Sequence, residues 1–204
     1  MEIILASKNK GKIREIERII QAPNLKLILL DDIDQKIPEI EEWGKDYIEN
    51  AIIKAKTVAK LTNKNTIADD SGLELKFLKG EPGPKSARFP SGECSDEERC
   101  KHILSLLEYE NPAQRKAKFV CVMVLYFISG ETLITRGECK GSISQEMKGH
   151  NGFGYDPIFI PRGFNKTFAE LNQSIKNEIS HRYNAIKDLK LLLSNYLKDA
   201  DKPE

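Results

Sequence analysis

The sequence predicts an α/β protein with a mixed central sheet flanked by helices, and two features carry this prediction. Ile3–Ala6 has the apolar, β-branched pattern of a buried strand, and a polar loop, a helical apolar pattern and a second strand pattern at 25–30 follow it. This order is typical of two parallel strands joined by a helical crossover. Farther along, the apolar run Phe119–Ile128 precedes a Ser-Gly-Glu turn and Thr132–Thr135. That pattern predicts an antiparallel hairpin, so the sheet is expected to be mixed.

Apolar periodicity and capping residues predict the remaining helices. We expect Pro23-Asn24 to end the first helix, Asp46 to cap the second, and Ser95 with Glu98 to form the capping box of the third. The residues after Lys198 are expected to be frayed. The apolar stripe expected on the last helix comprises Ile179, Tyr183, Ile186, Leu189, Leu193 and Leu197.

Composition narrows the class of protein. The chain has 204 residues, 40% of them hydrophobic, and a formal net charge of +1. The length and hydrophobic content predict a single domain that comprises residues 1–198, followed by a tail at 199–204. The small net charge gives the protein no overall attraction to nucleic acid or membrane. The start of the chain lacks a secretory pattern, and no apolar run is long enough to span a membrane. The four widely spaced cysteines have no zinc-ligand spacing, so we expect reduced thiols and a cytoplasmic protein.

The most informative stretch is a pair of adjacent carboxylates. A short strand at Thr66–Ala68 leads into Asp69, Asp70, Ser71 and Gly72. Because side chains alternate across a strand, Asp69 and Asp70 should point to opposite sides, and only one of them can face a given cleft. Carboxylates are suited to magnesium, which binds one or two of them together with substrate phosphates. The alternative is a polar turn, since Asp, Ser and Gly are turn residues.

A polar loop at the start of the first helix is a candidate phosphate site. Free N–H groups and the helix dipole favour an anion there, and three lysines add positive charge. The alternative is an ordinary solvated basic loop; the sequence does not contain a Walker A motif. The candidate residues of this loop are Ser7, Lys8, Asn9, Lys10, Gly11 and Lys12.

Three further features are candidates for parts of the site. Glu41 and Glu42 lie in an acidic loop, and one of them could converge with one of Asp69 and Asp70 as metal ligands. In the glycine-rich loop 152–157, Phe153 could stack on a flat ligand and Asp156 could accept from a base N–H, although a tight loop with a core aromatic is the alternative. Lys176 and the sequence Ser180-His181-Arg182 form a candidate donor cluster before and at the start of the last helix.

Taken together and in order, these segments resemble the inosine triphosphatase family, the pyrophosphatases of non-canonical purine nucleoside triphosphates. The resemblance covers nearly the whole chain. It is carried by the segments Ser7–Lys12, Glu42–Gly44, Glu49–Ala55, Ala68–Leu73, Pro82–Arg88, Gly152–Phe159 and Ile175–Arg182. Lys8 stands where the family usually has Gly, and Ile175 stands in place of Glu.

The resemblance implies Mg²⁺-dependent hydrolysis of ITP, dITP and XTP to the monophosphate and pyrophosphate, a cleft between two lobes, and a homodimer. Asp70 would be the general base and, with Glu41 or Glu42, a metal ligand. The residues that would hold phosphates or sugar are Ser7 to Lys12, Ser71 and Lys176. The residues that would recognise the purine are Phe153, Gly154, Tyr155, Asp156, His181 and Arg182.

Two other functions compete with this interpretation. One is a pyrophosphatase of related fold that acts on pyrimidine or modified nucleotides. Phe153 and Arg182 argue against it, because they favour a purine. The other is a non-catalytic binder of nucleotides or single-stranded nucleic acid. The nearly neutral charge argues against a stable nucleic-acid or membrane partner.

Overall fold

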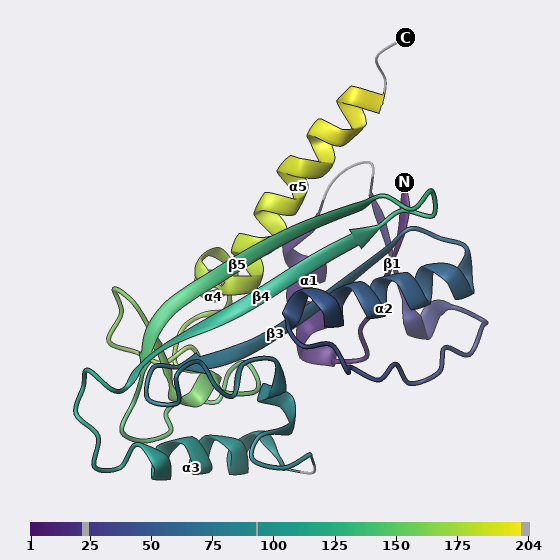
Figure 1. Cartoon of the computed structure of the whole chain (residues 1–204). Helices are drawn as coiled ribbons and strands as arrows, with labels where there is room; N and C mark the ends of the chain where they lie inside the picture. The colour runs from purple at the N-terminus through teal and green to yellow at the C-terminus, as the bar shows by residue number, and fades with distance from the viewer. Residues whose placement is uncertain (22–24, 93, 201–204) are drawn as a thin grey trace. The chain divides into compact units, whose positions relative to one another are not determined.

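The computed structural model describes residues 1–21, 25–92 and 94–200. Over these residues, six strands form one sheet in the order β2-β1-β3-β4-β5-β6. Figure 1 shows β3, β4 and β5 as long strands side by side. The strands are β1 (Glu2–Leu5), β2 (Lys26–Leu29), β3 (Thr66–Leu75), β4 (Lys116–Tyr126), β5 (Thr132–Ile143) and β6 (Phe159–Pro161).

The sheet is mixed, which confirms the predicted α/β class. β1 pairs in parallel with both β2 and β3, whereas β5 pairs antiparallel with β6. The helices are α1 (Lys10–Ile19), α2 (Tyr47–Thr62), α3 (Asp96–Leu106), α4 (Gln173–Ile179) and α5 (His181–Ala200). Three short 3-10 helices are η1 (Leu30–Asp32), η2 (Gly83–Arg88) and η3 (Asp156–Ile158).

The predicted caps are confirmed. The Asp46 side chain accepts from the Glu49 N–H, and Ser95 and Glu98 form a reciprocal capping box. The predicted end of the first helix at Pro23-Asn24 lies outside the described residues, as do 201–204 of the predicted frayed tail. α5 itself continues to Ala200, two residues beyond the expected limit of the domain.

Two sequence-based expectations were wrong in detail. β3 does not end before the paired carboxylates but passes through them without interruption, and both Asp69 and Asp70 are buried. Ile179, expected on the apolar stripe of the last helix, instead ends α4, whereas α5 begins at His181, within the segment predicted to open the last helix. Ser180 separates them in an extended conformation, with its N–H bonded to the Lys176 carbonyl.

Contacts divide the chain into two compact units. Unit 1 comprises Met1–Asp70, Cys121–Gly137 and Arg182–Glu204, and unit 2 comprises Ser71–Val120 and Glu138–His181. Each unit has its own apolar core. The unit 1 core takes residues from β1, α1, β4 and α5, among them Ile3, Ile16, Met123, Ile186 and Leu189. The unit 2 core takes residues from β3, α3, β4, β5 and β6, among them Leu73, Ile103, Phe119, Ile143 and Phe159.

The four cysteines are free thiols, and three of them are buried. Burial raises the pKa of Cys100, Cys121 and Cys139 to about 12, so these thiols stay protonated at neutral pH. Among the described residues, no helix combines the length and the apolar character that crossing a membrane requires.

The segment Pro82–Arg88 supports β3 within unit 2. The Ser86 hydroxyl accepts from the Leu73 N–H at 2.8 Å and donates to the Gly83 carbonyl at 2.6 Å. A Cβ on Gly72 would lie 2.0 Å from the Gly83 carbonyl oxygen. The backbone of η2 therefore packs directly on β3, beside the carboxylate pair in the sequence, and only glycine at position 72 permits this approach.

We expect Gly72→Ala to destabilise the protein by about 1–3 kcal/mol, because the added methyl group must push the η2 backbone away from β3. Denaturant unfolding of the purified variant measures the effect. Gly92→Ala is the matched control, since a Cβ there has no neighbour within 4 Å. Equal stability of the two variants would show that η2 does not pack tightly on β3.

Candidate functional site

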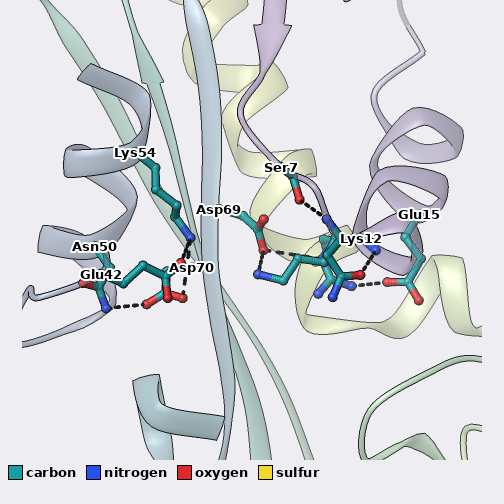
Figure 2. Close-up of polar contacts among 10 residues, drawn as sticks. Ser7, Lys12, Glu15, Glu42, Asn50, Lys54, Asp69 and Asp70 are labelled. Carbon is teal, nitrogen blue, oxygen red and sulfur yellow. Dashed lines mark hydrogen bonds and ion pairs between the residues drawn. The ribbon is translucent and has the colours of Figure 1, made fainter. Parts of the chain in front are cut away.

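The adjacent carboxylates of β3 lie on opposite sides of the strand, as the alternation of side chains predicts. Figure 2 shows Asp69 directed toward Lys12 and Asp70 directed toward Asn50 and Lys54, with the β3 ribbon between them. All five residues belong to unit 1. The strand therefore separates two polar groups that differ in their charge balance.

Asp69 is the compensated member of the pair. Its Oδ2 lies 2.9 Å from Lys12 Nζ and 3.8 Å from Arg182 Nε. Burial favours the neutral acid, but Lys12, Arg182 and Lys54 outweigh burial and lower the pKa of Asp69 to about 2. Arg182 also pairs with the buried carboxylate of Glu15 on α1. Asp69 is thus a permanent anion within a buried network of alternating charges.

Asp70 is the poorly compensated member. Its Oδ2 accepts from Asn50 Nδ2 at 3.0 Å, and its Oδ1 lies 3.9 Å from Lys54 Nζ. Lys54 is closer to Glu42, at 2.6 Å from its Oε1. Burial, aided by the negative charge of Glu42, exceeds the attraction of Lys54 and Lys12 and raises the pKa of Asp70 to about 6. A carboxylate with this pKa can accept a proton near neutral pH.

Asn50 connects Asp70 to the acidic loop. Its Nδ2 donates to Asp70, and its Oδ1 accepts from the Gly44 N–H at 2.8 Å. A Cβ on Gly44 would lie 2.6 Å from that same Oδ1, so glycine is required at this contact. The loop that carries Glu42 is therefore held to the strand that carries Asp70 through one buried amide.

Three residues of these groups were not predicted from the sequence as site residues: Glu15, Asn50 and Lys54. A signal for two of them was present, because Asn50 and Lys54 belong to the segment 49–55 and are spaced i, i+4 on one face of α2. Glu15 gave a weaker signal. It lies in an ordinary amphipathic pattern, and only the fold shows that it is buried against Arg182.

The N-terminal loop has the predicted position before a helix. Asn9 caps α1 by accepting from the Lys12 N–H at 3.0 Å, and Ser7 Oγ accepts from the Asn9 N–H at 3.3 Å. Lys8 and Lys10 are exposed, whereas Gly11 is buried. The loop thus offers exposed cations beside the N-terminus of α1, and Lys12 extends from there to Asp69.

The two candidate glutamates are not equivalent. Glu42 is half-buried and shares Lys54 with Asp70, whereas Glu41 is exposed and has no recorded partner in the described part of the chain. Among the described residues, no group of three His, Cys, Asp or Glu side chains is arranged for a metal. Two carboxylates suffice for Mg²⁺ that also binds phosphates. Glu42 and Asp70, which flank one ammonium group, fit such an ion.

In unit 2, the glycine-rich loop is organised around Asp156. The buried Asp156 carboxylate accepts from the Phe153 N–H at 2.9 Å and pairs with the ammonium of Lys176, which is also buried. That ammonium lies 5.0 Å from the centre of the Phe153 ring. A Cβ on Gly152 would lie 1.9 Å from Asp156 Oδ2, so this glycine is required. Asp156 therefore positions Phe153 and Lys176 relative to each other.

The other predicted residues of unit 2 have distinct environments. Tyr155 belongs to the apolar core, and its hydroxyl donates to the Ser86 carbonyl at 2.8 Å. The Gly154 N–H donates to Asp96 at the start of α3 at 2.6 Å, and the residue has a φ of 61°. Ser71 is half-buried on β3, directly after Asp70. Phe153 is the half-buried aromatic of the loop.

Each of the three donors predicted before and at the start of the last helix has a partner of its own in the fold. His181 stacks on Phe119 with ring centres 4.7 Å apart, Arg182 pairs with Glu15, and Lys176 pairs with Asp156. Consecutive residues of a helix point about 100° apart, since a turn contains 3.6 residues. His181 and Arg182 therefore contact different elements, and each is almost fully buried.

Known proteins resemble the chain over almost its full length. The model of the Ham1 family matches residues 3–192. A dITP/XTP pyrophosphatase of Bacillus licheniformis is 43% identical over 192 residues, which cover 94% of this chain and 97% of that protein. The dITP/XTP pyrophosphatase of Bacillus subtilis is 42% identical, with 94% and 96% covered.

Solved structures agree with the sequence comparison. A HAM1 protein from Coxiella burnetii superimposes with a TM-score of 0.86 and 39% identity, covering 96% of this chain and 99% of that chain. The Staphylococcus aureus Ham1 protein gives a TM-score of 0.83 and 41% identity, with 96% and 100% covered. Family, sequence and fold point the same way: the chain belongs to the Ham1 family.

Proposed function

We propose that this protein hydrolyses non-canonical purine nucleoside triphosphates (ITP, dITP and XTP) to the nucleoside monophosphate and pyrophosphate, which removes them from the nucleotide pool. The main structural support for this function is the difference between the two adjacent carboxylates. Asp69 is held as an anion, whereas Asp70 has a pKa of about 6. The relatives named dITP/XTP pyrophosphatases supply the substrate class.

Asp70 is the proposed general base. Its carboxylate would accept a proton from the water that attacks the α-phosphorus, while the bond to the leaving pyrophosphate breaks. Asn50 donates to one oxygen of Asp70 at 3.0 Å and so holds the carboxylate in one orientation. The raised pKa suits the role, because a general base is most effective when its pKa lies near the working pH.

The triphosphate needs positive charge, and unit 1 provides it at two places. Lys12 and the N-terminus of α1, with Ser7 to Gly11 before it, are the proposed phosphate contacts. Lys54 lies between Glu42 and Asp70 and is the second cation. Fixed charges at these positions would stabilise the charge that develops on the phosphates in the transition state.

Mg²⁺ is the proposed cofactor, held by Glu42 and Asp70. When bound, it would neutralise phosphate charge and favour the ionised form of Asp70. Glu41 is not included, since its exposed side chain has no recorded contact with this group in the described residues. The buried amide of Asn50, bonded to both Gly44 and Asp70, would keep the two ligand-bearing segments together.

The proposed purine-recognising residues are those of loop 153–156 with His181 and Arg182, and Lys176 and Ser71 would contact phosphates or sugar. Hypoxanthine and xanthine carry an oxygen acceptor at position 6, where adenine carries an amino donor. A buried hydrogen-bond donor that pairs with this oxygen would have no acceptor when adenine is bound. Such a mismatch can give about 10⁴-fold selection against adenine nucleotides. A cytoplasmic homodimer without a stable nucleic-acid or membrane partner is part of this proposal, motivated by the sequence resemblance and by the net charge of only +1.

Product analysis tests the function directly. We expect inosine triphosphate with Mg²⁺ to give inosine monophosphate and pyrophosphate, and ATP and GTP to be hydrolysed far more slowly. Release of free phosphate and a diphosphate would place the attack at the γ-phosphorus and contradict the proposed phosphate contacts. Turnover of pyrimidine triphosphates alone would support the related pyrophosphatase instead.

Asp70→Asn should lose activity and gain stability. The amide cannot accept the proton, so kcat should fall by at least about 10²-fold. The folded-state pKa of Asp70 is above its unfolded value, so ionisation of this group near pH 8 costs stability, by up to about 3 kcal/mol. Thermal unfolding at pH 8 should therefore show a higher Tm for the variant. A variant that keeps nearly full kcat would remove Asp70 from the mechanism.

The two glutamates should respond differently to neutralisation. We expect Glu42→Gln to raise the Mg²⁺ concentration needed for half-maximal activity by at least about tenfold, and Glu41→Gln to leave it nearly unchanged. Trp43 is the single tryptophan, is 73% exposed and follows Glu42 directly, so its fluorescence offers a binding signal without turnover. Equal effects of the two variants would contradict the assignment of Glu42.

The acid limb of the pH profile should report Asp70. In the free enzyme, kcat/KM should fall below about pH 6, because protonated Asp70 cannot act as a base. Higher Mg²⁺ should move this limb to lower pH, since a bound cation favours the carboxylate. Measuring kcat/KM from pH 5 to 8 at two Mg²⁺ concentrations checks both statements. A limb that stays fixed when Mg²⁺ changes would separate Asp70 from the metal.

A further inference from the structure

An open pocket of about 970 Å³ in unit 2 shares no residue with the candidate site. Side chains from β3, β4, β5 and β6 and from the turns beside them line it. Six of its lining residues are cationic and one is acidic, in a chain whose formal net charge is only +1. Positive charge is therefore concentrated at this pocket, in a protein that otherwise is close to neutral.

Four of these cations form what we term the cationic patch: Lys76, Lys116, Lys140 and Arg162. The Lys76 N–H donates to the Lys116 carbonyl at 2.9 Å, and the Arg162 N–H donates to the Lys140 carbonyl at 2.9 Å. In each pair, a residue directly after one strand (Lys76 after β3, Arg162 after β6) thus lies opposite a residue of the neighbouring strand. Like charges placed opposite one another on a sheet repel, so each pair costs stability in the absence of an anion.

The register of β4 and β5 joins the two pairs. The Ile143 N–H donates to the Arg115 carbonyl at 2.8 Å, which places Lys116 opposite Ser142 and diagonal to Lys140. Lys116, Lys140 and Ser142 all line the same pocket. The patch extends from the residue after β3, across β4 and β5, to the residue after β6, a span of about 14 Å for neighbouring strands about 4.8 Å apart.

The patch lacks compensating acids. Lys118, on the same face, lies 3.2 Å from Glu74 and 2.8 Å from Glu138, so both nearby carboxylates are used by that lysine. In the described part of the chain, none of the four patch cations has an ion pair, and all four are exposed. A ligand that matches this surface must bring several negative charges.

Charge also indicates which occupant fits. A two-fold contact centred on the patch would place it against its own copy, cation against cation. A single phosphate is too small for a patch that spans about 14 Å. Linked phosphates can reach several of its cations. Pro161 and Phe164, the latter 38% exposed, add an apolar wall that a flat group attached to the phosphates could cover.

We propose that the cationic patch is a second anion site of this protein, which binds small molecules with linked phosphates. The ligand class includes inorganic tripolyphosphate and nucleoside triphosphates, which share the phosphate chain and differ in the base. The site is separate from the residues assigned to hydrolysis, so its occupancy can be measured without turnover.

Lysine acylation followed by mass spectrometry locates binding. Tripolyphosphate, without Mg²⁺ and at low ionic strength, should slow acylation of Lys116 and Lys140 several-fold. Lys56 and Lys60, exposed on α2, should be unaffected and serve as internal controls. In Lys116→Gln, the tripolyphosphate concentration that protects Lys140 should rise by at least about tenfold, whereas Lys56→Gln should leave it unchanged.

Further acylation experiments with other anions identify which molecule the patch binds, and some of their outcomes would overturn the proposal. If ATP protects the lysines more strongly than tripolyphosphate does, and Phe164→Ala removes the difference, the ligand is a nucleotide. If ATP and tripolyphosphate protect equally, the site binds the phosphate chain alone. Protection by a single-stranded oligonucleotide but not by tripolyphosphate would overturn the proposal. Protection without any added anion that disappears on dilution would show that a second copy covers the patch, and would also overturn it.

Discussion

The buried anion of Asp69 is the interaction on which the rest of unit 1 depends. An isolated ionised carboxylate in a protein interior is very costly, so the fold must bring cations to it. Lys12 comes from α1, and Arg182 comes from the start of α5, where Glu15 balances its remaining charge. Three segments far apart in the sequence thus meet at one side of β3, in a network of alternating charge. Removal of one member would leave its partner buried and unpaired.

Because Asp69 takes the compensating cations on one side of β3, Asp70 can remain reactive on the other side. Asp70 is buried, and its polar neighbours are the Asn50 amide and the Lys54 ammonium, which Asp70 shares with Glu42. Burial, aided by Glu42 and only partly offset by Lys54 and Lys12, raises the pKa of Asp70. One structural acid and one functional acid are thus produced from two adjacent aspartates by the alternation of a single strand.

Unit 2 uses the same principle in a loop. The buried Asp156 carboxylate has two donors, the Phe153 N–H and Lys176, and so holds an aromatic residue and an ammonium group next to each other. Glycine at 152 is needed because the carboxylate occupies the space of a Cβ. The cationic patch of the same unit contrasts with this site, since its charges have no internal partner among the described residues. At Asp156 the protein itself supplies the counter-charge, whereas at the cationic patch we assign the counter-charge to a ligand.

The sequence by itself determined the α/β class, the mixed sheet, the caps at Asp46 and Ser95, and the opposite directions of Asp69 and Asp70. These properties follow from local periodicity and from hydrogen bonds between near neighbours. It did not determine that β3 continues through its carboxylates, that Ser180 divides the last helical segment, or that Glu42 rather than Glu41 lies with Asp70. Nor did it reveal the burial of Glu15 or the alignment of Lys76 with Lys116. Those outcomes depend on which distant charges and carbonyls meet, and only the tertiary structure decides that, because compensation of buried charge and cross-strand register act between residues far apart in the chain.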